Sequence, residues 1–450
     1  MKENLGRARA ERRRHLMTNA AALALLTFAA VATIQASRRG STRGGRRWGD
    51  ADDMAIPKFK AIDVQGLPPE FQESYRRKRH GAWTARHGAK SDRELILSGE
   101  ASLVDLAIHS KDDGSGGYDA IGTFCHVDFY LHKADPTIVP MFRDLVAKSI
   151  HCSRRRSQQI RMDLQSIAEE ARKYDNRDDT ATRSMEPAGF AFHESRCGST
   201  LVANSLMAMD PEANRVYSES PPPLNAAKMI SEDDGPDSSA VRLLRDVIYM
   251  MGRTNDNQEQ RLFFKIQSIG TKSLPAFSKA FPQTPWIFIH RDPVQVMMSH
   301  LKTKDKTEAV CTRSRSAPPT DLVALVKARD PSAKVTRLST EDYCAAHLAS
   351  LCEAAYSAHE SSDRSGRFVD YVDLPDVLID DIIPNHFHQV MGEESKSRIR
   401  KISGTYSKAR TVGKTWQEDS QKKEDAARPE IRTASAKYLQ PVWEKMKQMG

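Results

Sequence analysis

From residue 188 onward, short apolar segments alternate with segments of helical periodicity, and this alternation constrains the fold more than any other feature. Apolar runs suited to buried strands occupy 189–193, 215–219, 261–268, 285–291 and 367–374. Helical patterns follow at 199–209, 221–230, near 237–252, and at 273–281, 293–302, 341–358, 394–403 and 429–448. Parallel strands need such crossover helices, which cover both faces of the sheet. The sequence therefore predicts an α/β domain with a parallel sheet flanked by helices.

The borders of this domain are set by changes in composition. Residues 303–340 are rich in Ser, Pro and charged residues and show little periodicity, which predicts a long loop. We expect this loop to lie near the functional site of the domain. We place the domain at 186–450. An N-terminal region of unknown role, 61–185, precedes it.

That N-terminal region has weaker patterns. A strand is expected at 124–132 and a helix within 136–149, followed by a polar helix or linker and a loop at 153–185. His126 and Asp128 have the H-x-D spacing of some non-haem iron sites, but without a second His the pair suits alternating residues of a strand.

The first 60 residues resemble a membrane anchor followed by a stem. Residues 15–36 contain no Lys, Arg, Asp or Glu and are about 20 residues long, enough to span a bilayer. Arginines at 7–14 precede this run, which favours a cytosolic N-terminus and a signal anchor within residues 1–36. Residues 37–60 are Arg/Gly/Ser-rich, as in a flexible stem. We expect a single-pass type II membrane protein of the Golgi or secretory pathway; a cleaved signal peptide and an organelle transit peptide stay open.

The basic charge of the chain is confined to this head. The net charge is +9, but residues 1–50 hold eleven Lys/Arg against three Asp/Glu, so residues 51–450 carry only +1. A nearly neutral body does not indicate nucleic acid as a partner.

Six cysteines are present, an even number that suits disulfides in an oxidising lumen. Cys344 and Cys352 lie on one expected helix, where they cannot pair with each other.

The junction HESRCGST, residues 193–200, carries the first chemical signal. It joins an expected strand to an expected helix, where backbone N–H groups and the helix dipole favour an anion. Gly198 permits close backbone approach, Ser199 and Thr200 add hydroxyl donors, and Arg196 adds a charged fork. These residues describe an oxyanion cradle.

A nucleotide-triphosphate loop would read G-x-x-x-x-G-K-[ST]. Here Ser199 stands at the Lys position and His193 at the first Gly, which argues against a kinase or ATPase. Taken alone, the fragment also suits an ordinary strand-to-helix turn.

A second junction narrows the interpretation. IHRDPVQVMMSHL, residues 289–301, places Arg291 at a strand end and Ser299 eight residues later. Two helical turns bring Ser299 back toward the helix start, so both groups can approach one phosphate.

Together the two junctions resemble the sulfotransferase superfamily that uses 3′-phosphoadenosine-5′-phosphosulfate. In that family P-[KR]-[ST]-G-[ST]-T binds the 5′-phosphosulfate, and R-[ND]-P with a Ser eight residues after the Arg binds the 3′-phosphate; SRCGST and RDPVQVMMS are similar. The resemblance covers about 188–450 and is nearest a bacterial-type group through the runs Ser218–Pro222, Pro285–Pro293 and Tyr406–Lys408. It implies a P-loop NTPase-like sulfotransferase fold, this nucleotide (PAPS) as donor, 3′,5′-ADP (PAP) as product and no metal.

The resemblance also assigns roles to individual residues. Soluble small-molecule sulfotransferases use a His where this chain has Gln267, whereas tyrosylprotein and heparan enzymes use a Glu at a place comparable to Glu219. Glu219 is therefore the expected general base, with His193 a lesser candidate, and Lys265 and Arg196 are expected to assist catalysis. The expected donor-binding residues are Arg196, Cys197, Gly198, Ser199, Thr200, Leu201, Arg291, Ser299 and Lys408.

Three further expectations complete the prediction. Cys197 is interpreted as a small packing residue, although a helix N-terminus can activate a thiol. Lys408 and Arg410 occupy the family's C-terminal basic segment, which helps to hold the 3′-phosphate. The acceptor would carry a hydroxyl or amine on a glycan, protein or small molecule; the alternative is an inactive nucleotide-binding or membrane-tethered interaction module of the same fold.

Overall fold

The fold of the chain was analysed in a computed structural model that describes residues 90–111, 117–149, 152, 159–301, 309–361 and 366–449. The expected anchor at 15–36 and stem at 37–60 lie outside these residues. Within the described ranges, no helix has both the length and the apolar character needed to cross a membrane.

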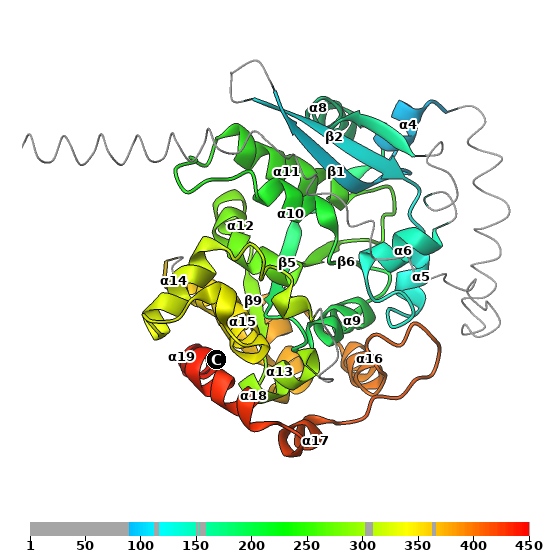
Figure 1. Cartoon of the computed structure of the whole chain (residues 1–450). Coiled ribbons are helices and arrows are strands. Elements are labelled where there is room, and N and C mark those ends of the chain that lie inside the picture. Colours follow the sequence, from blue (N-terminus) through cyan, green and yellow to red (C-terminus); the bar gives the residue numbers. More distant parts are fainter. Residues whose placement is uncertain are drawn as a thin grey trace, which may run out of the picture. The chain divides into compact units, whose positions relative to one another are not determined.

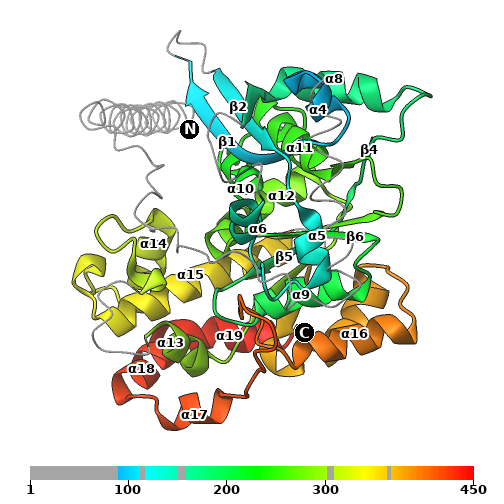
Figure 2. The same ribbon diagram turned by 90° about the vertical axis from the view of Figure 1, so that its right-hand side faces the viewer.

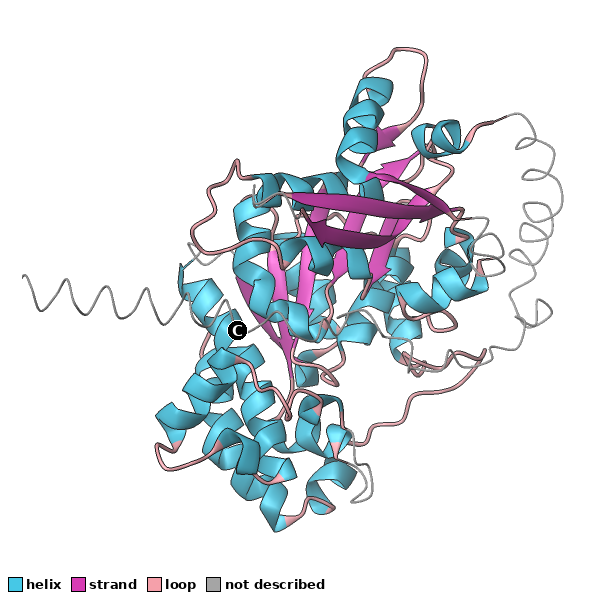
Figure 3. Cartoon of the chain, turned by 45° about the horizontal axis from the view of Figure 1, so that its top comes forward, coloured by secondary structure: helices cyan, strands magenta, loops and turns pink. Residues whose placement is uncertain are grey.

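A five-stranded parallel sheet forms the centre of the described residues (Figure 1; Figure 3). Its spatial order is β10 (Gly366–Asp370), β9 (Trp286–His290), β5 (Pro187–His193), β8 (Arg261–Lys265) and β6 (Asn214–Ser218). Most strand residues are buried on both faces, as the near-continuous apolar runs predict. The predicted α/β class is confirmed.

Alternate residues of the strands point to opposite faces of the sheet and pack into two different hydrophobic cores. Phe190, Phe192 and Phe288 pack into the core shared with α11 (Ser239–Gly252), α12 (Leu274–Ala280) and α15 (Thr340–Ser361). Ala191, Ile287 and Ile289 face the other core, with α9 (Ser199–Met209), the π-helix η8 (Leu378–His386) and α16 (Glu393–Ser403). This alternation follows from the two-residue period of a strand.

The remaining helices lie around these layers. They are α10 (Pro221–Ala227), the 3-10 helix η4 (Ser268–Ser273), α13 (Pro293–His300), α17 (Ser420–Asp425), and the continuous run of α18 (Pro429–Ala434), η9 (Ser435–Leu439) and α19 (Gln440–Lys447). The helices predicted at 394–403 and 429–448 are therefore present.

The N-terminal region packs against this domain and shares its main core. It consists of an antiparallel sheet, β1 (Ser102–Ser110), β2 (Tyr118–Cys125) and β3 (Ile160–Asp163), with α4 (Asp92–Leu97), α5 (Phe129–Ala134), α6 (Phe142–Lys148) and α8 (Leu164–Asp175). β1 contacts α10 and α11, and α5 lies beside α9 and β6 (Figure 1; Figure 2). A two-stranded sheet, β4 (Arg183–Ser184) with β7 (Arg253–Thr254), joins the two parts of the chain.

Several segments differ from the expectation. The strand predicted at 367–374 ends at Asp370, whose side chain accepts the Val372 N–H and caps the 3-10 helix η7 (Tyr371–Asp373). The strand predicted at 124–132 ends at Cys125, and Phe129 begins helix α5 because its ring packs edge-on against Tyr217. The loop predicted at 303–340 contains α14 (Thr320–Arg329) and two short 3-10 helices, η5 (Val310–Thr312) and η6 (Val335–Arg337). Only Leu322 and Val326 of α14 are buried, so its apolar stripe is too short to mark a helix in the sequence.

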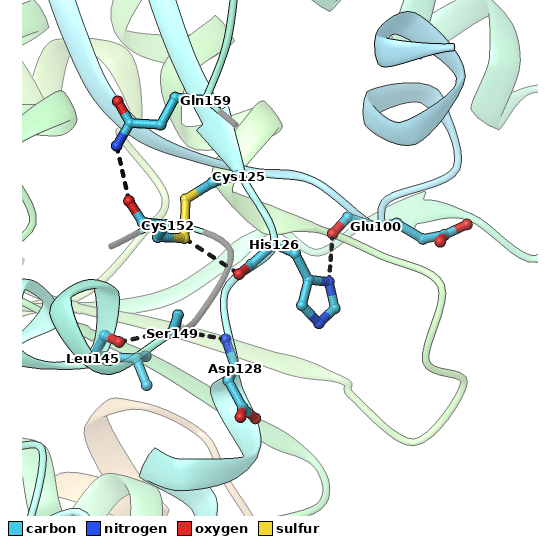
Figure 4. Close-up of a disulfide and its surroundings, with 8 residues drawn as sticks. All are labelled: Glu100, Cys125, His126, Asp128, Leu145, Ser149, Cys152 and Gln159. Atoms are coloured by element: carbon cyan, nitrogen blue, oxygen red, sulfur yellow. Dashed lines mark hydrogen bonds between the residues drawn. A yellow bond between two sulfur atoms is a disulfide. The ribbon is translucent and has the colours of Figure 1, made fainter. Parts of the chain in front are cut away.

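Two disulfides, Cys125–Cys152 and Cys311–Cys344, hold peripheral loops. Cys344 and Cys352 both lie on α15 and are not paired with each other, as predicted. Figure 4 shows the first disulfide with the H-x-D pair beside it: the His126 ring lies 3.0 Å from the Glu100 carbonyl oxygen, and the Asp128 N–H donates to Ser149 Oγ at 2.9 Å. Within the described residues, no group of three His, Cys, Asp or Glu side chains could hold a metal ion.

Candidate active site

The loop between β5 and α9 lies at the carboxyl end of the sheet and has an unusual backbone. Ser195 and Arg196 have φ angles of 81° and 59°, and Gly198, the N-cap of α9, has φ 89°. A Cβ on Gly198 would lie 2.4 Å from Cδ2 of Tyr371. Only glycine therefore allows the loop to take this path, and the loop borders a cavity.

This cavity, which we call the anion pocket, gathers most of the predicted donor-binding residues. Its volume is about 160 Å³. It is lined by Arg196, Gly198, Ser199, Thr200, Leu201, Arg291, Ser299, Tyr371, Ser403, Tyr406, Ser407, Lys408, Trp416, Asp419 and Lys423. The two junctions identified in the sequence thus meet around one pocket.

Several polar groups of the pocket have no partner of their own. Thr200 Oγ1 is buried without a hydrogen bond to any described residue. Arg196 and Lys408 likewise form no hydrogen bond or ion pair within the described part of the chain. Because unpaired buried donors and clustered cations are costly, this arrangement fits an anion that satisfies them.

The second corner of the pocket is built on Arg291, whose side chain is only 5 % exposed. Its guanidinium donates to Gln295 Oε1 at 3.0 Å and to Ser420 Oγ at 2.9 Å, and it lies 4.0 Å from the centre of the Tyr371 ring. Asp419 Oδ1 lies 3.3 Å from the same guanidinium and 2.6 Å from Lys423 Nζ. In this corner the Asp419 carboxylate therefore pairs with both cations, Arg291 and Lys423.

Glu194 links the β5–α9 loop to the segment that carries Arg291. Its buried carboxyl accepts a hydrogen bond from the Arg291 N–H at 2.6 Å, and its own N–H donates to the Ile289 carbonyl oxygen at 3.3 Å. Burial raises the pKa of Glu194 to about 8, so the carboxyl is largely neutral at pH 7. This brace was not predicted, because a Glu at the end of an apolar strand gives no sign of its partner.

Cys197 does not line the pocket. Its buried thiol donates to the Ile289 carbonyl oxygen at 3.1 Å, and burial raises its pKa to about 12. The interpretation as a packing residue agrees with this geometry, whereas its expected place among the donor-binding residues is limited to the backbone of the loop.

Glu219 and Lys265 lie at the ends of the neighbouring strands β6 and β8 and form an ion pair. The Glu219 side chain is 29 % exposed. Burial opposes its ionisation, but the nearby positive charges, above all Lys265, lower the pKa of Glu219 to about 2. Gln267 donates from Nε2 to the Glu219 carbonyl oxygen at 3.3 Å, which supports the left-handed backbone of Glu219 at φ 60°.

His193 lies beside this pair, 3.6 Å from Glu219 Oε1 through Nε2. Its Nδ1 accepts the Ser195 N–H at 3.0 Å, so the neutral ring carries its proton on Nε2. Burial, together with the charge of Lys265, lowers the pKa of His193 to about 3. With Nδ1 accepting the Ser195 N–H and Nε2 protonated, the His193 ring has no free lone pair with which to take a proton from an acceptor.

The two cations of the C-terminal basic segment, Lys408 and Arg410, lie in different surroundings. Lys408 lines the anion pocket, and burial and the charge of Lys265 lower its pKa to about 8. Arg410 does not line the pocket and pairs instead with Asp144 of the N-terminal region, at 3.0 Å. The structure therefore does not bring Arg410 to the pocket, where it was expected to help hold a phosphate.

A second cavity of about 620 Å³ adjoins the anion pocket. The two share Leu201, Arg291, Tyr371, Ser403 and Trp416, and Trp443 adds another aromatic wall. No sequence pattern marks Tyr371, Trp416, Asp419 or Lys423 as pocket residues, because Tyr371 falls in an apolar run typical of a strand and the others lie in a loop and a short helix without periodicity.

Comparisons with known proteins add a fold-level likeness. No protein-family model matches the chain, and no curated protein matches it. Among solved structures, it is similar to the sulfotransferase STF9 from Mycobacterium avium, at 11 % identity and a TM-score of 0.36, over 72 % of this chain and 86 % of that chain. It is also similar to the sulfotransferase domain of the olefin synthase from Synechococcus PCC 7002, at 14 % identity and a TM-score of 0.32, over 58 % of this chain and 96 % of that chain. At these identities and TM-scores the likeness carries no argument about this chain.

Proposed function

We propose that this protein transfers a sulfuryl group from 3′-phosphoadenosine-5′-phosphosulfate to a hydroxyl or amine acceptor and releases 3′,5′-ADP. The observation that carries this proposal is the set of unpaired groups, Arg196, Lys408 and Thr200 Oγ1, in the same pocket as Arg291 and Ser299. A strained glycine loop and orphaned donors at a helix N-terminus fit a phosphosulfate.

The donor would lie across the two corners. The loop N–H groups, Arg196, Ser199 and Thr200 would hold its 5′-phosphosulfate end, and Arg291 and Ser299 its 3′-phosphate. The larger cavity, with Tyr371 and Trp416 on its wall, has the size and aromatic character to enclose the nucleoside. The donor supplies an activated sulfuryl group; the protein supplies charge, orientation and a base.

Glu219 would accept the proton that the acceptor hydroxyl loses as its oxygen attacks sulfur. A pKa of about 2 keeps Glu219 ionised but makes it a weak base while it is paired with Lys265. When the ammonium of Lys265 turns to the oxygen that bridges sulfur and phosphorus, Glu219 loses its strongest charge partner. Burial then raises the pKa of Glu219, so its basicity would increase when the donor is in place.

The cellular setting is part of the proposal. Two disulfides favour an oxidising compartment, since they seldom persist in the cytosol. We propose that residues 15–36 anchor the chain in a membrane of the secretory pathway and that the described residues act in its lumen. No nucleic-acid partner is proposed, because the charge of residues 51–450 is nearly balanced.

The test combines binding and turnover. Wild type, Arg291→Ala and a control, Arg177→Ala, are applied to immobilised 3′,5′-ADP. Arg177 is exposed, pairs with Asp179 and does not line the pocket. We expect wild type and Arg177→Ala to be retained and Arg291→Ala to elute early. The same proteins are then incubated with radiolabelled donor and a panel of hydroxyl and amine acceptors. Retention without transfer to any acceptor would identify a nucleotide-binding module instead, and equal elution of all three would remove the donor site.

A further inference from the structure

The turn that carries Lys408 is fixed on both sides by other parts of the chain. On one side, Asn204 Nδ2 of helix α9 donates to the Ser407 carbonyl oxygen at 3.0 Å. On the other side, the Arg410 N–H donates to the Thr137 carbonyl oxygen at 3.0 Å. Lys408 thus lies between two anchors, one on the donor-binding helix and one in the N-terminal region.

The anchor in the N-terminal region is reinforced by a buried ion pair. Asp144 of α6 is 2 % exposed, and its Oδ2 lies 3.2 Å from Nε and 3.0 Å from Nη2 of Arg410. Removing one partner of such a pair leaves a buried charge, which is strongly unfavourable. Arg410 is therefore held firmly, although its left-handed backbone, at φ 54°, is strained.

The same N-terminal segment also touches the strand that carries the expected base. Ser218 Oγ lies 3.5 Å from Met141 Sδ, and the Phe142 ring packs edge-on against Tyr217, with centres 5.0 Å apart. Glu219 follows directly after these strand residues. Residues 137–144 thus contact both the end of β6 and the turn at 407–410.

Lys408 lines the anion pocket together with Arg196, Ser199 and Thr200, the residues proposed to hold the phosphosulfate. Its charge also interacts with those of Lys265 and Glu219, which favours the sulfuryl end of the pocket over the 3′-phosphate end. A cation that makes no ion pair or hydrogen bond within the described residues, yet lies among other cations, has no structural role that explains its position. It is available to a developing negative charge.

We propose that Lys408 is a catalytic residue at the sulfuryl end of the site, and that Asp144 and Arg410 are positioning residues that hold it there. This inference rests on the proposed function and deepens it. It also gives the N-terminal region a role: residues 137–144 complete the active site through the turn that they hold, without contributing a reacting group.

The test compares turnover in a double-mutant cycle. Variants Asp144→Asn, Lys408→Met and the double variant are assayed for kcat and for the donor KM. Arg172→Gln is the matched control, because Arg172 also pairs across the two parts of the chain, with Asp246 at 2.6 Å, but away from the pocket. Removing one transition-state cation is expected to lower kcat about 100-fold in Lys408→Met. Asp144→Asn is expected to lower kcat about 10-fold or more, with the donor KM changed by less than about threefold.

The decisive measurement is the kcat of the double variant compared with that of Lys408→Met. If Asp144 acts through Lys408, Asp144→Asn will cause no further loss of kcat in the Lys408→Met background, whereas a general loss of folding would multiply with it. Multiplying effects, or a Lys408→Met variant with wild-type kcat, would overturn the inference. Arg172→Gln should leave kcat unchanged.

A second readout works without turnover and separates this inference from the proposed function. The acylation of Lys408 by an amine-reactive reagent is followed against pH by mass spectrometry. In wild type the midpoint should lie near the lowered pKa of about 8, and in Asp144→Asn it should move up toward an ordinary lysine value as the released turn becomes exposed. An unchanged midpoint and rate would contradict the positioning role, whatever the assays with donor show.

Discussion

At the scale of single residues, the site combines polar groups without partners and one ion pair. Arg196, Lys408 and Thr200 Oγ1 have no hydrogen-bond or ion-pair partner within the described residues. Glu219 and Lys265, in contrast, neutralise each other. Under the proposed function, Glu219 would become an effective base only after Lys265 turns to the bound donor. The proposed chemistry therefore depends on the order in which donor and acceptor bind.

Replacement of the expected base should separate binding from chemistry. Glu219→Gln keeps the shape of the side chain but cannot accept the acceptor's proton, so kcat is expected to fall by about 10²- to 10⁴-fold. Affinity for 3′,5′-ADP, measured by calorimetry, should change by less than about threefold, since Glu219 does not line the anion pocket that would hold this nucleotide. Glu186→Gln, an exposed residue next to the start of β5, is the control. A Glu219→Gln enzyme with wild-type kcat would rule out this base.

The pH dependence of turnover should report Lys408. In the free enzyme, whose titration kcat/KM reports, the pKa of Glu219 is about 2, so Glu219 should contribute no acidic limb to the pH profile of kcat/KM. Lys408 must keep its proton to act as a cation, and with a pKa of about 8 it loses the proton as the pH rises above that value. Transfer rates should therefore fall above about pH 8 in wild type. Lys408→Arg, which stays charged, should remove that alkaline limb; a limb that persists unchanged would assign it to another group.

At the scale of elements, two strand-to-helix junctions bring the corners of the pocket together. The β5–α9 junction supplies the glycine loop and the β9–α13 junction supplies Arg291 and Ser299. Because adjacent parallel strands end at the same edge, the carboxyl ends of β5 and β9 place these groups around one cavity.

Adding one methyl group to the glycine loop should disturb this junction. Gly198→Ala would place its Cβ 2.4 Å from the Tyr371 ring and force an L-residue into φ 89°. A loss of stability of about 1–3 kcal/mol is expected from the backbone alone, with loss of retention on 3′,5′-ADP. Gly235→Ala is the control, because no atom lies within 4 Å of its added Cβ. Denaturant unfolding and column retention measure the two effects; equal behaviour of both variants would show that the loop tolerates a side chain.

Much of this element-level arrangement could be predicted from the sequence. The strands are continuous apolar runs, and the Arg–Gly–Ser–Thr and Arg–Asp–Pro junctions are local patterns, so their meeting follows from parallel topology. The contributions of Asp419, Lys423 and Trp416 could not be predicted, because they come from loops and a short helix placed by tertiary packing alone. Phe129 shows the same limit in the fold: its contact with Tyr217 turned an apparent strand into a helix.

At the scale of the whole molecule, the N-terminal region and the sheet domain depend on shared buried charges. Arg253 donates to the Ile96 carbonyl oxygen at 2.6 Å and pairs with Asp175 at 2.6 Å, and both side chains are buried. Lys133 lies 3.0 Å from Glu259, which also binds Arg215. Such links indicate that the two regions unfold together.

Breaking one of these links should lower the stability of the whole unit. Arg253→Met leaves Asp175 buried without its cation, and a loss of about 3–5 kcal/mol is expected. Arg172→Met removes a more exposed pair and should cost no more than about 1 kcal/mol. Urea unfolding followed by fluorescence and circular dichroism should show one transition in each case. Two separated transitions in wild type would mean that the regions fold independently.

The carboxylate of Asp419 has a consequence for product release under the proposed function. It contacts Arg291 and Lys423 in the donor-free protein, so it would pair with these cations again when 3′,5′-ADP departs. An internal competitor of this kind weakens the grip on the product and shortens its residence time. Asp419→Asn should therefore bind 3′,5′-ADP more tightly and release it more slowly in stopped-flow displacement. The release of 3′,5′-ADP, which frees the site for the next donor, would then limit turnover.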